Sequence, residues 1–215
     1  MQEISFNTAA SFDSDDYGNL YICIGDAQTT IHGFPELTHR LDSVLGSILR
    51  IDPLGTDSAN GQYGIPTDNP WADDGDDNTL GEIFAYGFRN PHRISWDSSD
   101  ETFMLSGEIG ERSIEEINLI EPGNDYGWND REGTFVINSD WANNPNSEND
   151  EVFELPANDA DFGYTYPVVQ LGRNEARAII GGYIYRGAAI PALQGKYIFG
   201  DLQDGGKIFY VDADS

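Results

Sequence analysis

Short apolar runs separated by polar turns recur along almost the whole chain. The clearest stretch is Glu82 to Gly133, where the runs IFAYGF, RISWD, TFML and INLI alternate with segments rich in Asn, Asp, Gly and Pro. Short runs bounded by such turns are typical of β-strands. The remaining segments repeat this plan, and the pattern therefore predicts an all-β fold of short antiparallel strands.

Both ends of the chain follow the same pattern. Near the start, SFDSDDYGNLYICIGD predicts a hairpin with a long loop, and SILRIDP predicts a strand ending at Pro53. The end of the chain contains four strand-like runs with Gly-bearing turns, namely YPVVQ, IIGGYIYRG, GKYIFGD and KIFYVD. Such spacing favours an antiparallel sandwich or a β-propeller, and periodicity alone does not choose between them. Strand groups repeat roughly every 45 residues, which is compatible with propeller blades.

Four segments are too polar for strands. Residues 27–47 predict a loop with a short helix in PELTHRLDSVLG, while residues 54–81 and 134–163 predict long surface loops. Gly107 to Glu116 predicts a glycine-flanked acidic loop. His32 and His39 are seven residues apart, which permits a metal pair, although surface positions are the favoured interpretation. We treat residues 1–215 as a single domain.

Charge narrows the choice of partners. The chain has 38 Asp+Glu against 11 Lys+Arg, a net charge of −27, which disfavours nucleic acid and anionic membranes because both would be repelled. Adaptation to high salt and binding of divalent cations are two compatible interpretations of this surplus. The content of hydrophobic residues is 39%, enough for a core, but no run reaches the roughly 20 residues of a membrane helix.

The single cysteine, Cys23, lies in the apolar run LYICIG and predicts a buried core thiol. It has no partner for an internal disulfide. A low cysteine content fits a cytosolic protein and an exported bacterial or archaeal one alike. The first residues, Met1-Gln2-Glu3, show no basic or apolar export signal.

Five motifs carry a family resemblance. They are LGSILRIDPLGT, YGIPTDNPW, EIFAYGFRNPHRISWD, EEINLIEPGNDYGWNDREG and GGYIYRGAAIPALQGKYIFGD, in this order. The chain from about residue 11 to residue 212 thereby resembles the glucose/sorbosone dehydrogenase family, which contains soluble sugar dehydrogenases dependent on pyrroloquinoline quinone (PQQ) and relatives that resemble the hedgehog-interacting protein. The resemblance implies a six-bladed β-propeller with the cofactor on its top face. The strand groups account for about four blades, so we expect a segment of a longer protein, because an opened propeller would expose two sheet edges.

The resemblance also implies catalytic and cofactor-binding roles for Arg89 and Asn90. An Arg guanidinium suits the carboxylates and quinone oxygens of PQQ, and an Asn amide both donates to and accepts from a sugar hydroxyl. The alternative is that Arg89 is a structural turn residue tied to backbone carbonyls.

Four further residues are implied as calcium ligands. The carbonyls of Gly110 and Glu111 would face the Ca²⁺ that bridges to PQQ, and Glu116 with the Tyr126 carbonyl would match a second calcium site. Such oxygen donors suit Ca²⁺. The family's sugar oxidisers often have Pro where this chain has Glu111. The alternative is an acidic surface loop without an ion.

The chain lacks two residues that the family resemblance implies, a histidine general base and a lysine that contacts the cofactor. The implied histidine base would precede Ser11, but EISFNTAASFD has none, and His92 is the one histidine near the expected site. The clamping lysine is replaced by Gln203 or Asp204, with Lys207 a few positions on.

Three functions follow as hypotheses. The first is a PQQ- and calcium-dependent oxidation of an aldose-type sugar to its lactone, with an unknown electron acceptor. The second is a catalytically silent propeller that binds carbohydrate or protein, and the third, ranked last, is a calcium-dependent hydrolase such as a lactonase. The resemblance implies a periplasmic or extracellular location.

Overall fold

The described part of the chain is built on four antiparallel β-sheets. The structure, a computed structural model, describes residues 11–12, 18–29, 33–138, 152–203 and 205–213. The first sheet contains β1 (Ser11–Phe12), β2 (Leu20–Ile24), β3 (Ser47–Ile51) and β4 (Ile83–Tyr86) in that order. The second contains β5 (Pro91–Asp97), β6 (Asp100–Glu108), β7 (Ile114–Ile120) and β11 (Val169–Gly172), ordered β11-β7-β6-β5.

Two three-stranded sheets complete the fold. One contains β12 (Ile179–Tyr185), β13 (Lys196–Asp201) and β14 (Ile208–Asp212). The other, a small sheet, contains β8 (Arg131–Glu132), β9 (Phe135–Ile137) and β10 (Val152–Phe153). Three short 3-10 helices, η1 (Pro35–His39), η2 (Asp159–Phe162) and η3 (Pro191–Leu193), are the only helices in the described ranges. The all-β prediction is therefore confirmed.

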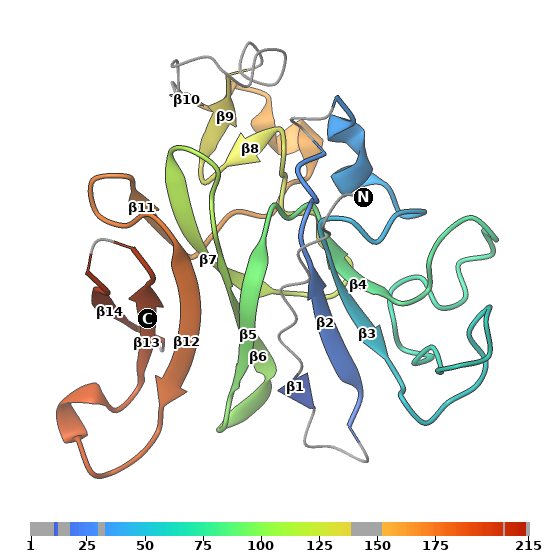
Figure 1. Cartoon of the computed structure of the whole chain (residues 1–215), viewed down its shortest axis with the longest axis horizontal. Coiled ribbons are helices and arrows are strands. Elements are labelled where there is room, and N and C mark those ends of the chain that lie inside the picture. The colour runs from blue at the N-terminus through green and yellow to red at the C-terminus, as the bar shows by residue number, and fades with distance from the viewer. Residues whose placement is uncertain (1–10, 13–17, 30–32, 139–151, 204, 214–215) are drawn as a thin grey trace.

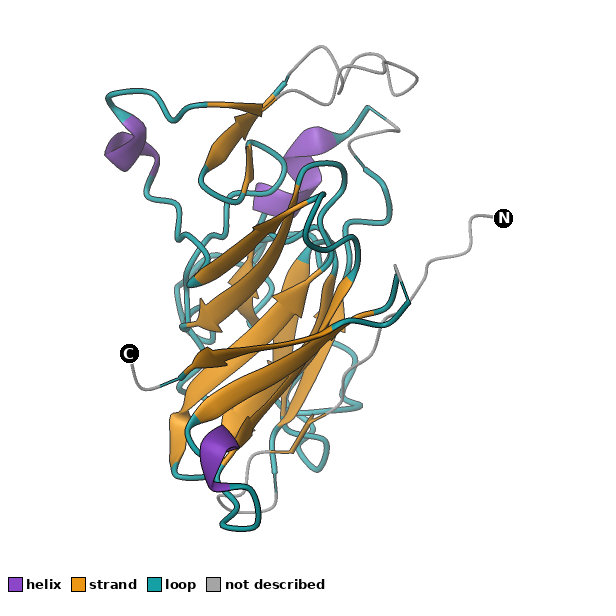
Figure 2. Cartoon of the chain, turned by 90° about the vertical axis from the view of Figure 1, so that its left-hand side faces the viewer, coloured by secondary structure: helices purple, strands orange, loops and turns teal. Residues whose placement is uncertain are grey.

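The sheets are arranged like blades of a propeller. Three larger sheets stand side by side in Figure 1, with β5 of the middle sheet contacting β2 of the first and β12 of the third. The small sheet, η1 and η2 lie together at one end, as Figure 2 also shows. Neighbouring strands in these sheets follow one another in the chain, except that β11 pairs with β7 after the small sheet has intervened.

Two buried clusters hold the three larger sheets together. Between the first and second sheets, Tyr21 packs edge-on against Phe84 and Trp96, with ring centroids 5.2 and 4.9 Å away. Between the second and third, Tyr197 is fully buried in a cluster with Ile117 and other apolar side chains. The cysteine at position 23 is fully buried, as predicted.

Strands β6 and β7 extend into the acidic segment Gly107 to Glu116, which its polar composition predicts to be a loop. The predicted loop Gly107 to Glu116 is wrong, because β6 continues to Glu108 and β7 begins at Ile114, leaving a loop of residues 109–113. Glu108, Glu115 and Glu116 are consequently buried strand residues. Backbone N–H groups from other segments satisfy these carboxyl groups, which allows acidic residues in a sheet interior.

The other loop predictions have mixed outcomes. Residues 54–81 form turns and bends, with one isolated bridge at Gly64, as predicted. The prediction of a plain loop over 134–163 is wrong where β9, β10 and η2 form, and residues 139–151 lie outside the described part. The predicted short helix is confirmed as a single 3-10 helix that ends at His39.

Candidate functional site

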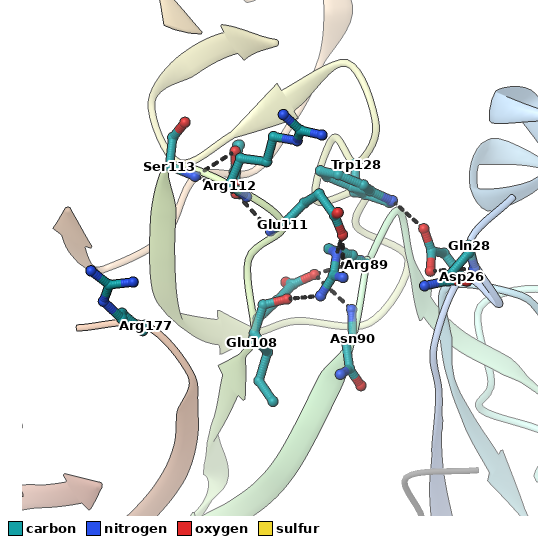
Figure 3. Close-up of polar contacts among 12 residues, drawn as sticks. Asp26, Gln28, Arg89, Asn90, Glu108, Glu111, Arg112, Ser113, Trp128 and Arg177 are labelled. Carbon is teal, nitrogen blue, oxygen red and sulfur yellow. Dashed lines mark hydrogen bonds and ion pairs between the residues drawn. The ribbon is translucent and has the colours of Figure 1, made fainter. Parts of the chain in front are cut away.

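The Arg89–Asn90 turn connects β4 to β5, and a buried carboxyl group holds its backbone. Glu108 Oε1 accepts the N–H of Arg89 at 2.5 Å and the N–H of Asn90 at 3.4 Å (Figure 3). On the other side the N–H of Asp26 donates to the Arg89 carbonyl at 2.7 Å. Gly25 leaves room for this approach, since a Cβ there would lie 3.2 Å from the same carbonyl. The turn is thus fixed from two sheets.

The Arg89 side chain reaches back to the loop of residues 109–113. Its Nε donates to Glu111 Oε2 at 2.6 Å, its Nη2 pairs with the same oxygen, and its Nη1 donates to the Ile109 carbonyl at 2.8 Å. The guanidinium also lies 6.0 Å from the Trp128 ring. The structure therefore brings Arg89 and Glu111 together, with each side chain 18% exposed.

One carboxyl group shapes this loop from below. Glu132 Oε1 accepts the N–H groups of Glu111, Arg112 and Ser113 at 2.7, 2.9 and 3.1 Å. Three donors on one carboxylate oxygen hold the backbone of this loop in a tight turn. The turn leaves no space for a side chain at Gly110. A Cβ at that position would lie 1.7 Å from the Ile114 carbonyl oxygen.

An arginine from a distant segment closes the loop on its outer side. Arg173 donates to the carbonyls of Glu111 and Arg112 at 2.5 and 2.6 Å, and to Glu115 Oε1 at 2.8 Å. The Glu111 carbonyl, expected to face Ca²⁺, thus already faces a guanidinium cation. This half of the implied bridging-calcium site does not fit a second cation well, because like charges repel at short range.

Glu116 lies in a different environment, a buried pair of acids. It stands opposite Glu108 across β6 and β7, and the Asn118 amide donates to both carboxyl groups at 3.1 and 3.2 Å. Burial, followed by the charge of Glu116, raises the pKa of Glu108 well above its usual range. Burial also raises the pKa of Glu116 to about 7. The N–H of Gly133 donates to this carboxyl group and opposes part of the rise.

The oxygen donors of this acid pair suit a hard cation. Asn118 Oδ1 is buried and has no hydrogen-bond partner, and a cation would relieve the repulsion between the two carboxyl groups. Tyr126 is buried nearby in the chain's core, stacked on Phe88 at 4.4 Å, with its hydroxyl donating to the Leu119 carbonyl. Within the described ranges, no three His, Cys, Asp or Glu side chains converge as a metal site.

Asp26 is a site residue that sequence reasoning missed. It is 6% exposed, accepts the Trp128 indole N–H at 2.9 Å, and accepts the Gln28 N–H at 2.9 Å (Figure 3). Burial raises its pKa, while those two hydrogen bonds and the charge of Arg89 oppose the rise. In the sequence Asp26 is only the polar end of a strand, so no signal distinguished it from other turn acids.

The histidines lie elsewhere. His92 contacts the backbone of Ile180 on β12, and burial lowers its pKa. His39, expected at the surface, is half-buried, with Nδ1 2.8 Å from Asp125 Oδ2 and Nε2 without a partner. Burial lowers its pKa, but the hydrogen bond and charge of Asp125 outweigh that effect. His32 and the segment before Ser11 lie outside the described residues.

Comparisons with known proteins agree with this fold. The profile of the Glucose / Sorbosone dehydrogenase family matches residues 2–215. The HIPL2 protein of Arabidopsis thaliana is 34% identical over 197 residues, covering 86% of this chain and 27% of that protein. The Homo sapiens Hedgehog-interacting protein is 28% identical over 191 residues, covering 86% of this chain and 22% of that protein.

Solved structures show the same architecture. The apo-form of the soluble aldose sugar dehydrogenase from Escherichia coli superposes with a TM-score of 0.64 and 24% identity, covering 95% of this chain and 52% of that one. The chain thus spans about a quarter of the first curated relatives and about half of this structure. In the described part no helix has the length and apolar character needed to cross a membrane. Its sheets form part of a six-bladed β-propeller, and the chain belongs to the glucose/sorbosone dehydrogenase family.

Proposed function

We propose that this chain carries part of the active site of a PQQ-dependent dehydrogenase that oxidises an aldose-type sugar to its lactone. The observation that carries the proposal is the Arg89–Asn90 turn, which Glu108 and Asp26 hold by its backbone. A turn fixed from both sides presents its side chains in one orientation, as a substrate-binding pair requires.

Each residue of the turn has a separate role in this proposal. The Arg89 guanidinium keeps donors beyond those it gives to Glu111 and Ile109, and it would bind anionic oxygens of the quinone. The Asn90 amide would orient a sugar hydroxyl. PQQ, when bound, supplies the two-electron oxidant.

Asp26 is the proposed proton acceptor in place of the absent histidine. Its backbone contacts Arg89, and its carboxyl group hydrogen-bonds Trp128, which faces the Arg89 guanidinium. A carboxyl whose pKa is raised by burial is a better base than an exposed one. The sugar hydroxyl proton would pass to a carboxyl oxygen of Asp26.

Calcium has one well-suited position. We propose that Ca²⁺ binds at Glu108 and Glu116 with Asn118 Oδ1. The family resemblance adds the Tyr126 carbonyl as a further ligand. There it would stabilise the strands beneath the Arg89–Asn90 turn. Gly110 and Glu111 are weaker candidates, since Arg173 already meets the Glu111 carbonyl. A periplasmic or extracellular location would supply the ion.

A second function, a silent propeller that binds carbohydrate or protein, is favoured by one observation. Arg89 is already paired with Glu111, so part of its guanidinium is committed within the chain and fewer donors remain for a ligand. The name Hedgehog-interacting protein shows that one relative binds a protein partner.

The test is a titration of the purified chain with PQQ, with and without Ca²⁺, followed by aldoses and a dye acceptor. We expect saturable binding that Arg89→Ala weakens, and turnover that Asp26→Asn lowers by about a hundredfold while PQQ binding persists. Arg40→Ala is the control, because Arg40 is exposed and pairs with Asp42 only two residues away. Absence of PQQ binding by the folded chain and also by a version extended at both ends would contradict the dehydrogenase proposal and favour the silent propeller.

A further inference from the structure

A row of aromatic rings leads from Arg89 toward η2, which lies with η1 and the small sheet at one end of the molecule (Figure 1). Trp128 begins the row, 4% exposed, with its ring 6.0 Å from the Arg89 guanidinium. The half-buried Tyr164 follows, packed so closely on Gly127 that a Cβ added there would lie 3.2 Å from Tyr164 Cγ. Phe162 in η2 ends the row, 5.8 Å from the Tyr164 ring and 49% exposed. Exposure therefore increases along the row.

The two outer rings are held in place by contacts within the chain. Tyr164 and Phe162 are nearly parallel, with an angle of 18° between their planes. The Arg131 guanidinium lies 5.1 and 5.0 Å from these rings, and its side chain is only 5% exposed, so it supports them from the interior. The Tyr164 hydroxyl donates to Asp130 Oδ2 at 2.7 Å. Rings fixed in this way can stack on a ligand with little further loss of side-chain freedom.

The charges beside the row favour a neutral ligand. Arg131 is paired with Asp159 at 2.7 Å, and His39, whose ring lies 5.6 Å from that of Tyr164, is paired with an acid as well. Asp130 adds a further carboxyl group next to the rings. An anionic sugar would be repelled here, whereas carboxylate oxygens accept hydrogen bonds from the hydroxyl groups of a neutral sugar.

A pyranose ring suits such a surface. One face of the sugar consists largely of C–H bonds, whose hydrogens are attracted to the electron-rich face of an aromatic ring. We propose that Tyr164 and Phe162 bind the outer residues of a neutral oligosaccharide whose reducing-end aldose lies at the Arg89–Asn90 turn. This inference rests on the proposed function, because it takes the turn as the reacting end. It names the substrate class as oligosaccharides with a free reducing end.

Calorimetric titration of the 215-residue chain with maltotriose, cellotriose and glucose tests this site. Phe162→Leu removes the aromatic ring but keeps an apolar side chain over Arg131. Phe153→Leu is the matched control, since Phe153 in β10 is also 49% exposed, and circular dichroism verifies folding. Phe162→Leu should weaken trisaccharide binding about three- to tenfold and leave glucose binding unchanged. The control variant should match the parent chain for every sugar.

Reduced trisaccharides separate this site from the proposed reaction. Their terminal carbonyl is an alcohol, so they cannot be oxidised to a lactone, yet they should bind with the same dependence on Phe162. If they bind in this way while PQQ binds neither this chain nor a version extended at both ends, the dehydrogenase function fails and the oligosaccharide site stands. If glucose is oxidised but trisaccharide binding is equal in parent and Phe162→Leu, the function stands and the site is overturned.

Two further results would overturn the oligosaccharide site. One is a folded parent chain that binds neither maltotriose nor cellotriose. The other is an equal loss of trisaccharide binding in Phe153→Leu and Phe162→Leu, which would show that the effect does not depend on the aromatic row.

Discussion

Glu108 lies directly opposite Glu116 across β6 and β7, and both carboxyl groups are buried around the amide of Asn118. Two acids this close, with one shared donor, cannot both ionise at low cost. The pair is therefore the most pH-sensitive element beneath the Arg89–Asn90 turn.

The acid pair makes stability fall as pH rises. The Glu116 pKa is about 7 in the folded chain against an ordinary value of 4.5, so the folded state binds more protons between these values. The free energy of unfolding, measured with urea, should decrease from about pH 4.5 to pH 7 and level off above it. Glu116→Gln should flatten this slope and raise stability at pH 7.5 by about 3 kcal/mol or less.

Calcium provides a second test of the same pair. If Ca²⁺ binds there, millimolar Ca²⁺ should raise the melting temperature of the parent chain near pH 7, and chelation should reverse the effect. The Glu116→Gln variant should not respond, because it lacks one ligand carboxylate. An equal response of parent and variant would place the ion elsewhere.

The ion pair of Asp97 and Arg186 links the second and third sheets. Its contribution to stability depends on pH in the direction opposite to that of the Glu108–Glu116 pair. Arg186 Nε donates to both Asp97 oxygens at 2.9 and 3.2 Å, and this pairing lowers the pKa of Asp97 to about 2. Because the folded pKa lies below the unfolded one, its contribution is present above about pH 4 and is lost as pH falls toward 2.

Removing that carboxylate should weaken the contact between the sheets. Asp97→Asn should lower the free energy of unfolding at pH 7 by about 1 to 2 kcal/mol, a modest value because the Arg186 side chain is 25% exposed. The loss should shrink near pH 2. A variant that matches the parent at pH 7 would show that the pair contributes little.

Glu132 should be necessary for the shape of the loop of residues 109–113. Glu132→Ala leaves the N–H groups of Glu111, Arg112 and Ser113 without their acceptor and should cost about 3 kcal/mol. Hydrogen exchange at these amides should become faster by a large factor. Glu132→Gln keeps an acceptor oxygen, so its stability and amide exchange rates should lie between those of Glu132→Ala and the parent chain.

Gly110 is the residue of this loop that cannot be replaced. A Cβ there would overlap the Ile114 carbonyl, so Gly110→Ala should destabilise the chain by about 3 kcal/mol in urea unfolding. Gly200→Ala is the matched control in β13, where the nearest atoms to an added Cβ lie 3.8 Å away. Equal stability of the two variants would contradict the steric argument.

The sequence predicts the strands well because their signals are local. Alternating runs such as KIFYVD need only their own residues and the flanking turns to be recognised, and β14 forms there. The five ordered motifs also identify the family correctly. Arg89 could be singled out in the same way, through its motif.

The environment of the site could not be predicted, because it depends on contacts between distant residues. Composition suggests that Glu108 and Glu116 are exposed, yet N–H groups of Arg89 and Gly133 allow their burial. Asp26 meets Trp128 across 102 residues, a pairing with no local pattern. Whether an acid lies at the surface or in the interior is decided by such partners.

The hold that Glu132 exerts on three successive N–H groups also has an evolutionary consequence. Glu132 sets the path of this loop through the backbone, so that path does not depend on which side chains stand at positions 111 and 112 for these hydrogen bonds. Substitutions at the two positions would leave this backbone scaffold in place while changing the charge and size presented to a ligand, although a change at Glu111 would also remove its pairing with Arg89. A lineage could therefore acquire a new substrate through this loop while the backbone hydrogen bonds to Glu132 stay the same.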